Sequence, residues 1–171
     1  YGCAIAFNTQ RFKPTCYTLF NMQAERATRA AAVAALWDLE ANCVHFAISC
    51  HLKGYNPEER EAHKPGAEIY PGNLELARQI EHLSSYPGYR LRIIGGDFNM
   101  DSKQHNDRHS MMRKHHYLGS PRRVLTEQNS KREVDFVYVQ GSLSHRVHEP
   151  DVIWPYPNAS DHLPRLLHIR P

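Results

Sequence analysis

The alternation of apolar and polar positions along the chain predicts several strands and one helix. The most regular alternation is in residues 42–52, "NCVHFAISCHL", where Val44, Phe46, Ile48 and Cys50 share one face of an extended strand. Apolar runs at residues 3–7, 15–20, 92–94, 134–139 and 165–169 predict further strands. Apolar residues at helical spacing in 74–83, behind Asn73 as the N-cap, predict a helix.

Residues 29–40, "RAAAVAALWDLE", allow two interpretations. Alanine favours a helix by intrinsic propensity. However, a short polar turn at 40–42 leads directly into the alternating strand, so we predict a β-hairpin with both segments as strands. Residues 53–72 are polar and contain Gly54, Pro57 and Pro65, which predicts a long loop. This order of elements indicates a single layered, mixed α/β domain over residues 1–171.

Composition places limits on the class of protein. A length of 171 residues is enough for one domain with a real core, and no run of about 18 or more apolar residues predicts a membrane span. The four cysteines, Cys3, Cys16, Cys43 and Cys50, show no zinc-ligand spacing and lie in strand-like runs where thiols are commonly buried. We therefore favour reduced thiols and a cytoplasmic or nuclear protein, while a secreted protein with one or two disulfides remains open.

Positive charge gathers in residues 103–123. The net charge is only +3, but this segment contains Lys103, Arg108, Arg113, Lys114, Arg122 and Arg123 together with four histidines. Such a surface suits a polyanion, so we expect Arg113, Lys114, Arg122 and Arg123 to bind nucleic acid. A solvated basic loop is the competing interpretation.

Polar residues follow several of the predicted strands. His51 follows "HFAISC", Asp97 and Asn99 follow "RIIGG", Asp135 begins "DFVYV", and Asp161-His162 precede the last strand. The glycines before Asp97 predict a tight turn or a close approach of the backbone to another group, although "GDFN" alone is more typical of an Asx turn. Carboxylates for a hard cation, imidazoles for proton transfer and a neutral amide together suit the hydrolysis of phosphate esters.

The ordered motifs "GCAIAFN", "SCHL", "GGDFN", "VDFVYV" and "SDHLP" resemble the endonuclease/exonuclease/phosphatase superfamily, whose members share the deoxyribonuclease I fold. The opening "GCAIAFNTQRFKP" is most similar to the branch of deadenylases, nocturnin and 2′,5′-phosphodiesterases. The resemblance implies a layered α/β sandwich of two packed mixed sheets flanked by helices. It also implies a divalent-metal-dependent phosphodiesterase, and the basic segment makes nucleic acid the favoured substrate.

The same resemblance implies roles for individual residues. Asp161 would bind Mg²⁺ or Mn²⁺, and Asp97 would contact the metal-bound phosphate or help to activate the nucleophile. Asn99 would hold a non-bridging phosphate oxygen, while the two glycines before it would let the strand end approach the phosphate.

The two histidines receive roles in the same way. His162 would be the catalytic imidazole, Asp135 would accept a hydrogen bond from it and fix its tautomer, and His51 would contact the scissile phosphate.

The family also carries an asparagine and a metal-binding glutamate before the "GCAI" strand, and the sequence begins at that strand. We therefore expect the chain to be the C-terminal portion of a longer enzyme, with the N-terminal half in the same or a separate chain. A relic with an incomplete site is the competing expectation. A phosphoinositide or sphingomyelin phosphodiesterase with "IWPYPN" (153–158) as a lipid-contacting loop, and a non-catalytic binding module, remain alternative functions.

Overall fold

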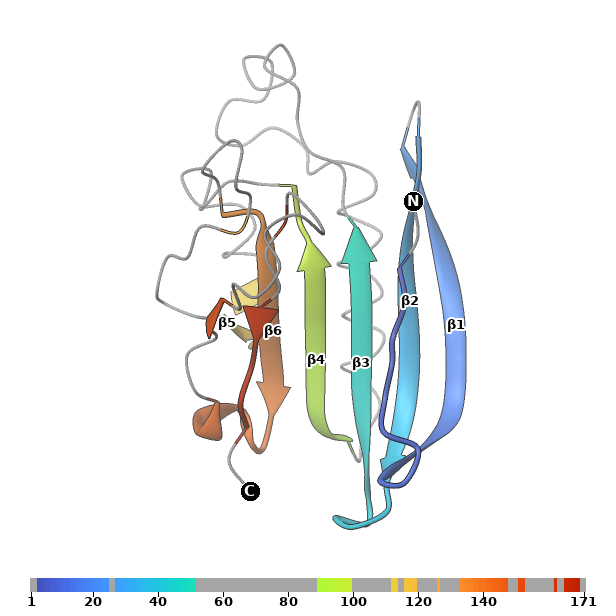
Figure 1. The fold of residues 1–171 in the computed structure, drawn as a ribbon, viewed down its shortest axis with the longest axis vertical. Coiled ribbons are helices and arrows are strands. Elements are labelled where there is room, and N and C mark those ends of the chain that lie inside the picture. The colour runs from blue at the N-terminus through green and yellow to red at the C-terminus, as the bar shows by residue number, and fades with distance from the viewer. Residues whose placement is uncertain are drawn as a thin grey trace.

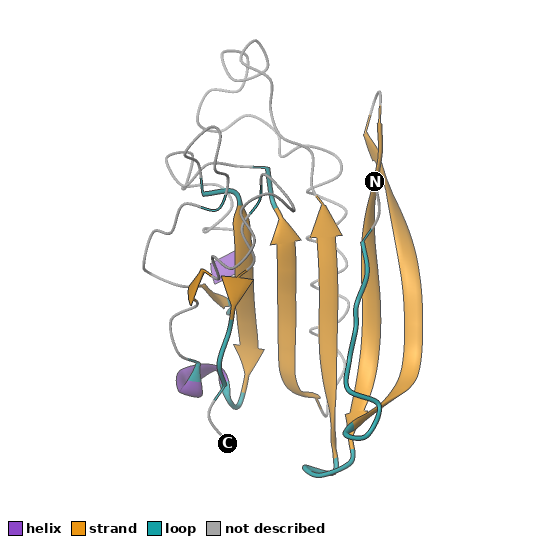
Figure 2. Cartoon of the chain, in the orientation of Figure 1, coloured by secondary structure: helices purple, strands orange, loops and turns teal. Residues whose placement is uncertain are grey.

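The computed structural model consists mainly of β-strands in the part of the chain that it describes (Figure 2). The described residues are 3–24, 27–51, 89–99, 112–113, 116–119, 126, 133–147, 151–152, 162 and 165–169. The predicted loop at 53–72 and the predicted helix at 74–83 lie outside these residues.

Six strands form the main sheet in the order β1-β2-β3-β4-β6-β5 (Figure 1). Their bounds are β1 Phe12–Ala24, β2 Ala27–Asp38, β3 Cys43–His51, β4 Tyr89–Asp97, β5 Leu118–Gly119 and β6 Asp135–Gly141. A short 3-10 helix, η2, covers Ser144–Arg146, and β7 (Asp151–Val152) pairs with β8 (Arg165–Leu166) as a second, two-stranded sheet.

The main sheet is mixed, as the sequence predicts. β1, β2 and β3 are antiparallel neighbours, β3 and β4 run parallel, and β6 is antiparallel to β4 and β5. The parallel pair places the C-terminal ends of β3 and β4 at the same end of the sheet, where β6 begins (Figure 1). Polar residues from three different points of the sequence are thereby brought to one end of the sheet.

The predicted hairpin of β2 and β3 is confirmed. The two strands pair from Asp38↔Cys43 to Ala31↔Cys50, and Asn42 in the turn adopts a positive φ of 49°. Positions 31–36 of β2 are all buried, on both faces of the strand. Because a central strand needs small apolar residues on both sides, burial overrides the helical propensity of this alanine-rich segment.

Two predicted strands differ from the structure. Residues 3–7 form no strand: their side chains alternate between half-buried and exposed, but the segment pairs with no strand in the described part of the chain. Alternating side-chain exposure indicates an extended backbone, whereas a β-strand also needs a hydrogen-bonded neighbouring strand. The strand predicted at 165–169 is reduced to Arg165–Leu166, followed by an isolated bridge between Val147 and Ile169.

One face of the sheet carries the apolar cluster. Ile48 on β3, Ile94 on β4 and Tyr138 on β6 are register partners and are nearly or fully buried. The cluster comprises Ala31, Val33, Ala35, Phe46, Ile48, Cys50, Ile94, Phe98, Met112, Tyr117, Phe136 and Tyr138. It spans four neighbouring strands and holds them in one rigid layer.

The cysteines are less buried than their strand-like surroundings suggest. All four are free thiols, and Cys50 alone among them is buried, while Cys16 on β1 is exposed. Burial raises the pKa of the Cys50 thiol well above its usual range, so it remains protonated. Cys16 is exposed because β1 is the edge strand, on which Tyr17 and Leu19 are also exposed.

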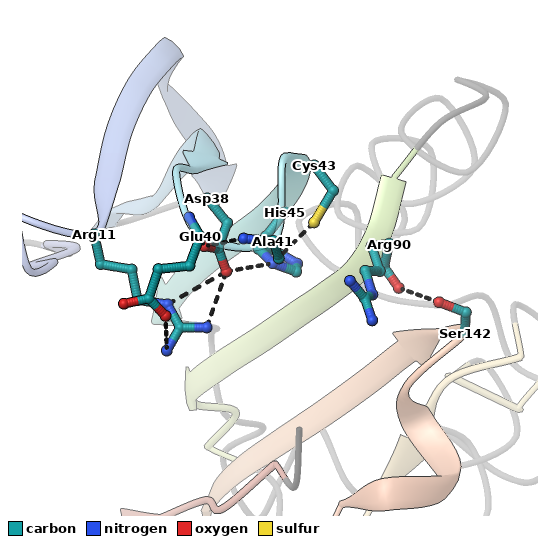
Figure 3. A network of polar contacts seen from close by, with 8 residues as sticks. All are labelled: Arg11, Asp38, Glu40, Ala41, Cys43, His45, Arg90 and Ser142. Atoms are coloured by element: carbon teal, nitrogen blue, oxygen red, sulfur yellow. Dashed lines mark hydrogen bonds and ion pairs between the residues drawn. The ribbon is translucent and has the colours of Figure 1, made fainter.

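A buried carboxylate fixes the end of the sheet at which β2 turns into β3 (Figure 3). Asp38 accepts hydrogen bonds from the Arg11 guanidinium at 3.1 Å and from the backbone amides of Glu40 and Ala41 at 3.0 and 3.1 Å. Burial would raise the pKa of Asp38, but the hydrogen bonds from Arg11, Ala41 and Glu40 outweigh it and lower the pKa to about 2. The ionised carboxylate therefore ties the turn to the segment that precedes β1.

His45 adds a third kind of contact to this carboxylate. Its Nε2 lies 3.3 Å from Asp38 Oδ2 and 3.5 Å from the Cys43 sulfur. Burial lowers the pKa of His45 even though the Asp38 carboxylate acts in the opposite direction, so the imidazole is neutral near pH 7. Elsewhere in Figure 3, Ser142 donates to the carbonyl of Arg90 at 3.2 Å and links the end of β6 to β4.

We expect Asp38 to make stability sensitive to acid. Its folded pKa of about 2 lies below the ordinary 3.8, so its contribution is complete above about pH 4 and is lost as the pH falls through about 2. Between about pH 5 and 2, the free energy of unfolding of the wild type should fall by about 2 kcal/mol more than that of Asp38→Asn. Urea titrations measure the difference, with the exposed Glu40→Gln as the control; parallel pH profiles of wild type and Asp38→Asn would contradict the assignment.

Candidate active site at the end of β3, β4 and β6

Three of the predicted site residues form one row across neighbouring strands. His51 is the last residue of β3, Asp97 the last of β4 and Asp135 the first of β6. His51 pairs in register with Asp97, and Asp97 pairs in register with Asp135. Register partners point to the same side of a sheet, so the three side chains share the face opposite to the apolar cluster. The row therefore lies where β3 and β4 end and β6 begins. Figure 1 shows these strand ends at the same end of the sheet.

Asp97 is held in place by its own turn. Its Oδ1 accepts the backbone N–H of Asn99 at 2.7 Å, and its Oδ2 accepts the Asn99 side-chain amide at 3.0 Å. His51 Nε2 lies 3.4 Å from the same Oδ2. The Asx turn that the sequence left as an alternative is therefore present, and Asn99 adopts a positive φ of 50° that asparagine tolerates. The turn orders a carboxylate, an amide and an imidazole together.

Asp135 and His162 form the second imidazole–carboxylate pair of the site. His162 Nδ1 lies 2.8 Å from Asp135 Oδ2, and the two side chains are 32% and 19% exposed. When Nδ1 donates to a carboxylate, the basic nitrogen of the neutral imidazole is Nε2. The contact therefore selects the tautomer that a general base requires. Asp97 and Asp135 are partners in the ladder, so the two pairs lie side by side.

The backbone of Asp135 is held by residues that sequence reasoning missed. Thr126 Oγ1 accepts the amides of Val134 and Asp135, each at 3.0 Å. Arg165 donates from Nη1 to the Asp135 carbonyl at 2.6 Å and to Glu133 Oε1 at 3.2 Å. The one available signal was the position of Arg165 in "SDHLPR", three residues after His162.

The other predicted residues are placed only in part. Asp161, Lys114, Arg122 and Arg123 lie outside the described residues. Arg113 is exposed at the surface, next to Met112, which is fully buried. The described part of the chain thus presents one charge of the basic segment to solvent.

The structure gives a physical reason for one of the two glycines before Asp97, which is Gly96. Its φ is +144°, and a Cβ added there would lie 1.9 Å from the carbonyl oxygen of Cys50. Gly95 has ordinary surroundings, with a side-chain atom of Val137 3.7 Å from the added Cβ. The close approach at Gly96 is therefore to the backbone of β3, one residue before His51 and Asp97 pair.

The carboxylates of the site are hard oxygen donors of the kind that Mg²⁺ prefers. Among the described residues, no group of three or more His, Cys, Asp or Glu side chains is arranged to hold a metal ion. Magnesium in enzymes commonly takes one or two carboxylates, several waters and the substrate phosphate, so the donors at this edge fit that mode.

Solved structures share this fold. One is an endonuclease/exonuclease/phosphatase from Bacteroides vulgatus (17% identity, TM-score 0.66), and another is a mannosyl-6-phosphatase from Bacteroides thetaiotaomicron (12%, 0.67). A third is the human nocturnin catalytic domain with a bound sulfate anion (16%, 0.65). Each match covers 96% of this chain and, respectively, 69%, 69% and 62% of the other chain. No protein-family model and no curated protein matches the sequence.

The chain therefore has the fold of the endonuclease/exonuclease/phosphatase proteins, as its motifs predict. At these identities the likeness is one of architecture. Within the described ranges, we find no helix that is both long and apolar enough to cross a bilayer.

We expect Gly96→Ala to separate β3 from β4 at the site. A methyl group 1.9 Å from the Cys50 carbonyl oxygen forces the strands apart, at a cost of roughly 3 kcal/mol in the free energy of unfolding. Gly95→Ala, one residue away in ordinary van der Waals contact, is the matched control and should change stability by less than about 1 kcal/mol. Chemical denaturation measures both, and equal stabilities of the two variants would contradict the close approach.

Proposed function

We propose that this chain is the catalytic part of a divalent-metal-dependent phosphodiesterase, with nucleic acid as the favoured substrate. The observation that carries the proposal is the row of His51, Asp97 and Asp135 across three strands, with His162 bound to Asp135. The fold supports it, because neighbouring structures include a phosphatase and an endonuclease/exonuclease/phosphatase protein.

His162 and Asp135 act together as the general base in this proposal. Asp135 holds the imidazole by Nδ1 at 2.8 Å, so Nε2 takes a proton from the attacking water. When the imidazole becomes charged, the adjacent carboxylate stabilises the cation. Both side chains are partly exposed, so substrate and solvent can reach them.

Asn99 and His51 bind the phosphate in this proposal, and Asp97 orients both of them. The Asn99 amide is neutral and is oriented by Asp97, so it can donate to a phosphate oxygen as negative charge develops. His51, 3.4 Å from Asp97, supplies a second donor, which is stronger when the imidazole is protonated.

Asp97 and Asp161 are the proposed ligands of Mg²⁺ or Mn²⁺. A bound cation would stabilise the charge of the phosphoryl group as a Lewis acid. The neighbouring structures extend beyond the match, and a segment before residue 1 would supply the glutamate that the motif resemblance implies. Without that glutamate, the isolated piece should bind metal weakly. The same segment would also complete a second packed sheet.

The basic segment is the reason for favouring nucleic acid. Arg113 is exposed, and Lys114, Arg122 and Arg123 belong to the same run of positive charge. A second candidate is a phosphomonoester substrate, because one neighbour is a mannosyl-6-phosphatase. Lipid phosphodiesters and a non-catalytic binding module are the remaining outcomes that the assay below separates.

We expect His162→Ala and Asp97→Ala to reduce phosphodiester hydrolysis by roughly 10²- to 10⁴-fold with little loss of stability. The full-length protein is assayed on bis(p-nitrophenyl) phosphate with Mg²⁺, Mn²⁺ or EDTA, followed by RNA, DNA, sphingomyelin, phosphoinositide and sugar-phosphate substrates. His145→Ala, an exposed histidine on η2, is the matched control and should retain full activity. Turnover of His162→Ala within about threefold of wild type would remove that residue from the mechanism, and hydrolysis unaffected by EDTA would remove the metal.

If the basic segment binds nucleic acid, replacing Arg113, Lys114, Arg122 and Arg123 by glutamine should weaken binding and flatten its salt dependence. Loss of four contacts to single-stranded phosphates should lower the slope of log K against log salt by roughly 3. Lys13→Gln with Arg146→Gln removes two exposed charges elsewhere and should leave the slope nearly unchanged. Fluorescence anisotropy at several salt concentrations measures it; an unchanged slope in the fourfold variant would identify the segment as a solvated loop.

A further inference from the structure

Each polar group of Asp135 is bound by a different side chain. Thr126 accepts its backbone N–H, Arg165 donates to its carbonyl, and the carboxylate binds His162. Asp135 is the first residue of β6, where the sheet ladder has only just begun. Side chains from elsewhere therefore hold the residue that orients the imidazole.

Arg165 is the most unusual member of this arrangement. Its Nη1 donates to both Glu133 and the Asp135 carbonyl, and its guanidinium carbon lies 5.6 Å from the centre of the Phe136 ring. Both Arg165 and Glu133 side chains are only 3% exposed. Arg165 lies three residues after His162, so one guanidinium connects the His162 segment to the start of β6.

Stability alone does not account for such a pair. Taking two charges out of water is costly, and apolar replacements of a buried ion pair are often neutral or stabilising. The cost is increased here because Arg165 Nε and Nη2 are buried and have no hydrogen-bond partner among the described residues. A buried guanidinium under these conditions indicates that it is needed to fix the positions of the groups that it binds.

We propose that Arg165, held by Glu133, is a positioning residue that fixes the His162 imidazole against the Asp135 carboxylate. The inference rests on the proposed function, because it assigns Arg165 to the same general base. At 3% exposure Arg165 does not reach the substrate, so its loss should lower kcat and leave KM nearly unchanged.

The variants separate positioning from stability. Arg165→Met removes the donor, Arg165→Lys keeps a charged donor, and Glu133→Leu combined with Arg165→Met replaces the whole pair by apolar side chains. Arg11→Met is the matched control, because it also breaks an arginine pair with a buried carboxylate, but at the opposite end of β2 and β3. Each is made in the full-length protein and checked by thermal unfolding.

Two readouts are used. The first is kcat and KM on the substrate that the wild type hydrolyses best. The second is the proton NMR resonance of the His162 Nδ1–H, which a short hydrogen bond to a carboxylate shifts downfield and protects from exchange. This second readout is independent of activity.

We expect Arg165→Met and the double variant to lose roughly 10- to 100-fold in kcat, with KM within about threefold, and to lose the protected Nδ1 proton. Arg165→Lys should recover most of the rate and the resonance, and Arg11→Met should reduce stability while retaining both. If Arg165→Met does not fold, the double variant and Arg165→Lys decide the question.

A folded Arg165→Met or double variant with wild-type kcat and an unchanged Nδ1 resonance would overturn the inference. If the wild type hydrolyses no phosphoester, the proposed function fails, and the Nδ1 resonance alone decides whether Arg165 positions His162. The two failures are therefore distinguishable.

Discussion

The candidate site depends on the register of three strands. β3 and β4 run parallel and β6 runs antiparallel to β4, so the last residues of two strands and the first residue of a third fall in one row. A shift of one residue would turn a side chain of the row to the opposite face, among the apolar cluster. Gly96 maintains this register because its missing side chain lets β4 approach the Cys50 carbonyl immediately before the row. The relative positions of the three polar side chains are therefore set by backbone pairing within the sheet.

The two faces of the sheet carry different groups of residues. The apolar cluster on one face fixes β2, β3, β4 and β6 as a layer. The other face carries the row of polar residues at one end and the Asp38 network at the other. Because both ends belong to the same rigid strands, their polar side chains are held in fixed relative positions.

The sequence predicts the strands well where alternation is regular and burial is one-sided, as in β3. It also predicts the residue types at the strand ends, and the structure brings four of them, His51, Asp97, Asp135 and His162, into two adjacent pairs. Strand pairing is a long-range property that periodicity does not carry, which is why residues 3–7 were wrongly predicted as a strand.

Contacts between distant residues were missed for the same physical reason. Asp135 and Arg165 are 30 positions apart in the sequence, and neither the residue types nor the local pattern predicts the hydrogen bond between them. The two glycines were recognised as a backbone signal, but only the neighbouring strand shows that Gly96 needs the space and that Gly95 does not.

Among the described residues, two arginines pair with a buried carboxylate, and the surroundings of the two pairs differ. At the β2–β3 turn, Arg11 remains 46% exposed, and hydrogen bonds from several donors outweigh the desolvation of the buried Asp38 carboxylate. At the start of β6, Glu133 and Arg165 are both buried. The second pair lies next to the imidazole–carboxylate pair, where the proposed reaction would be more sensitive than folding to an error of about 1 Å in position.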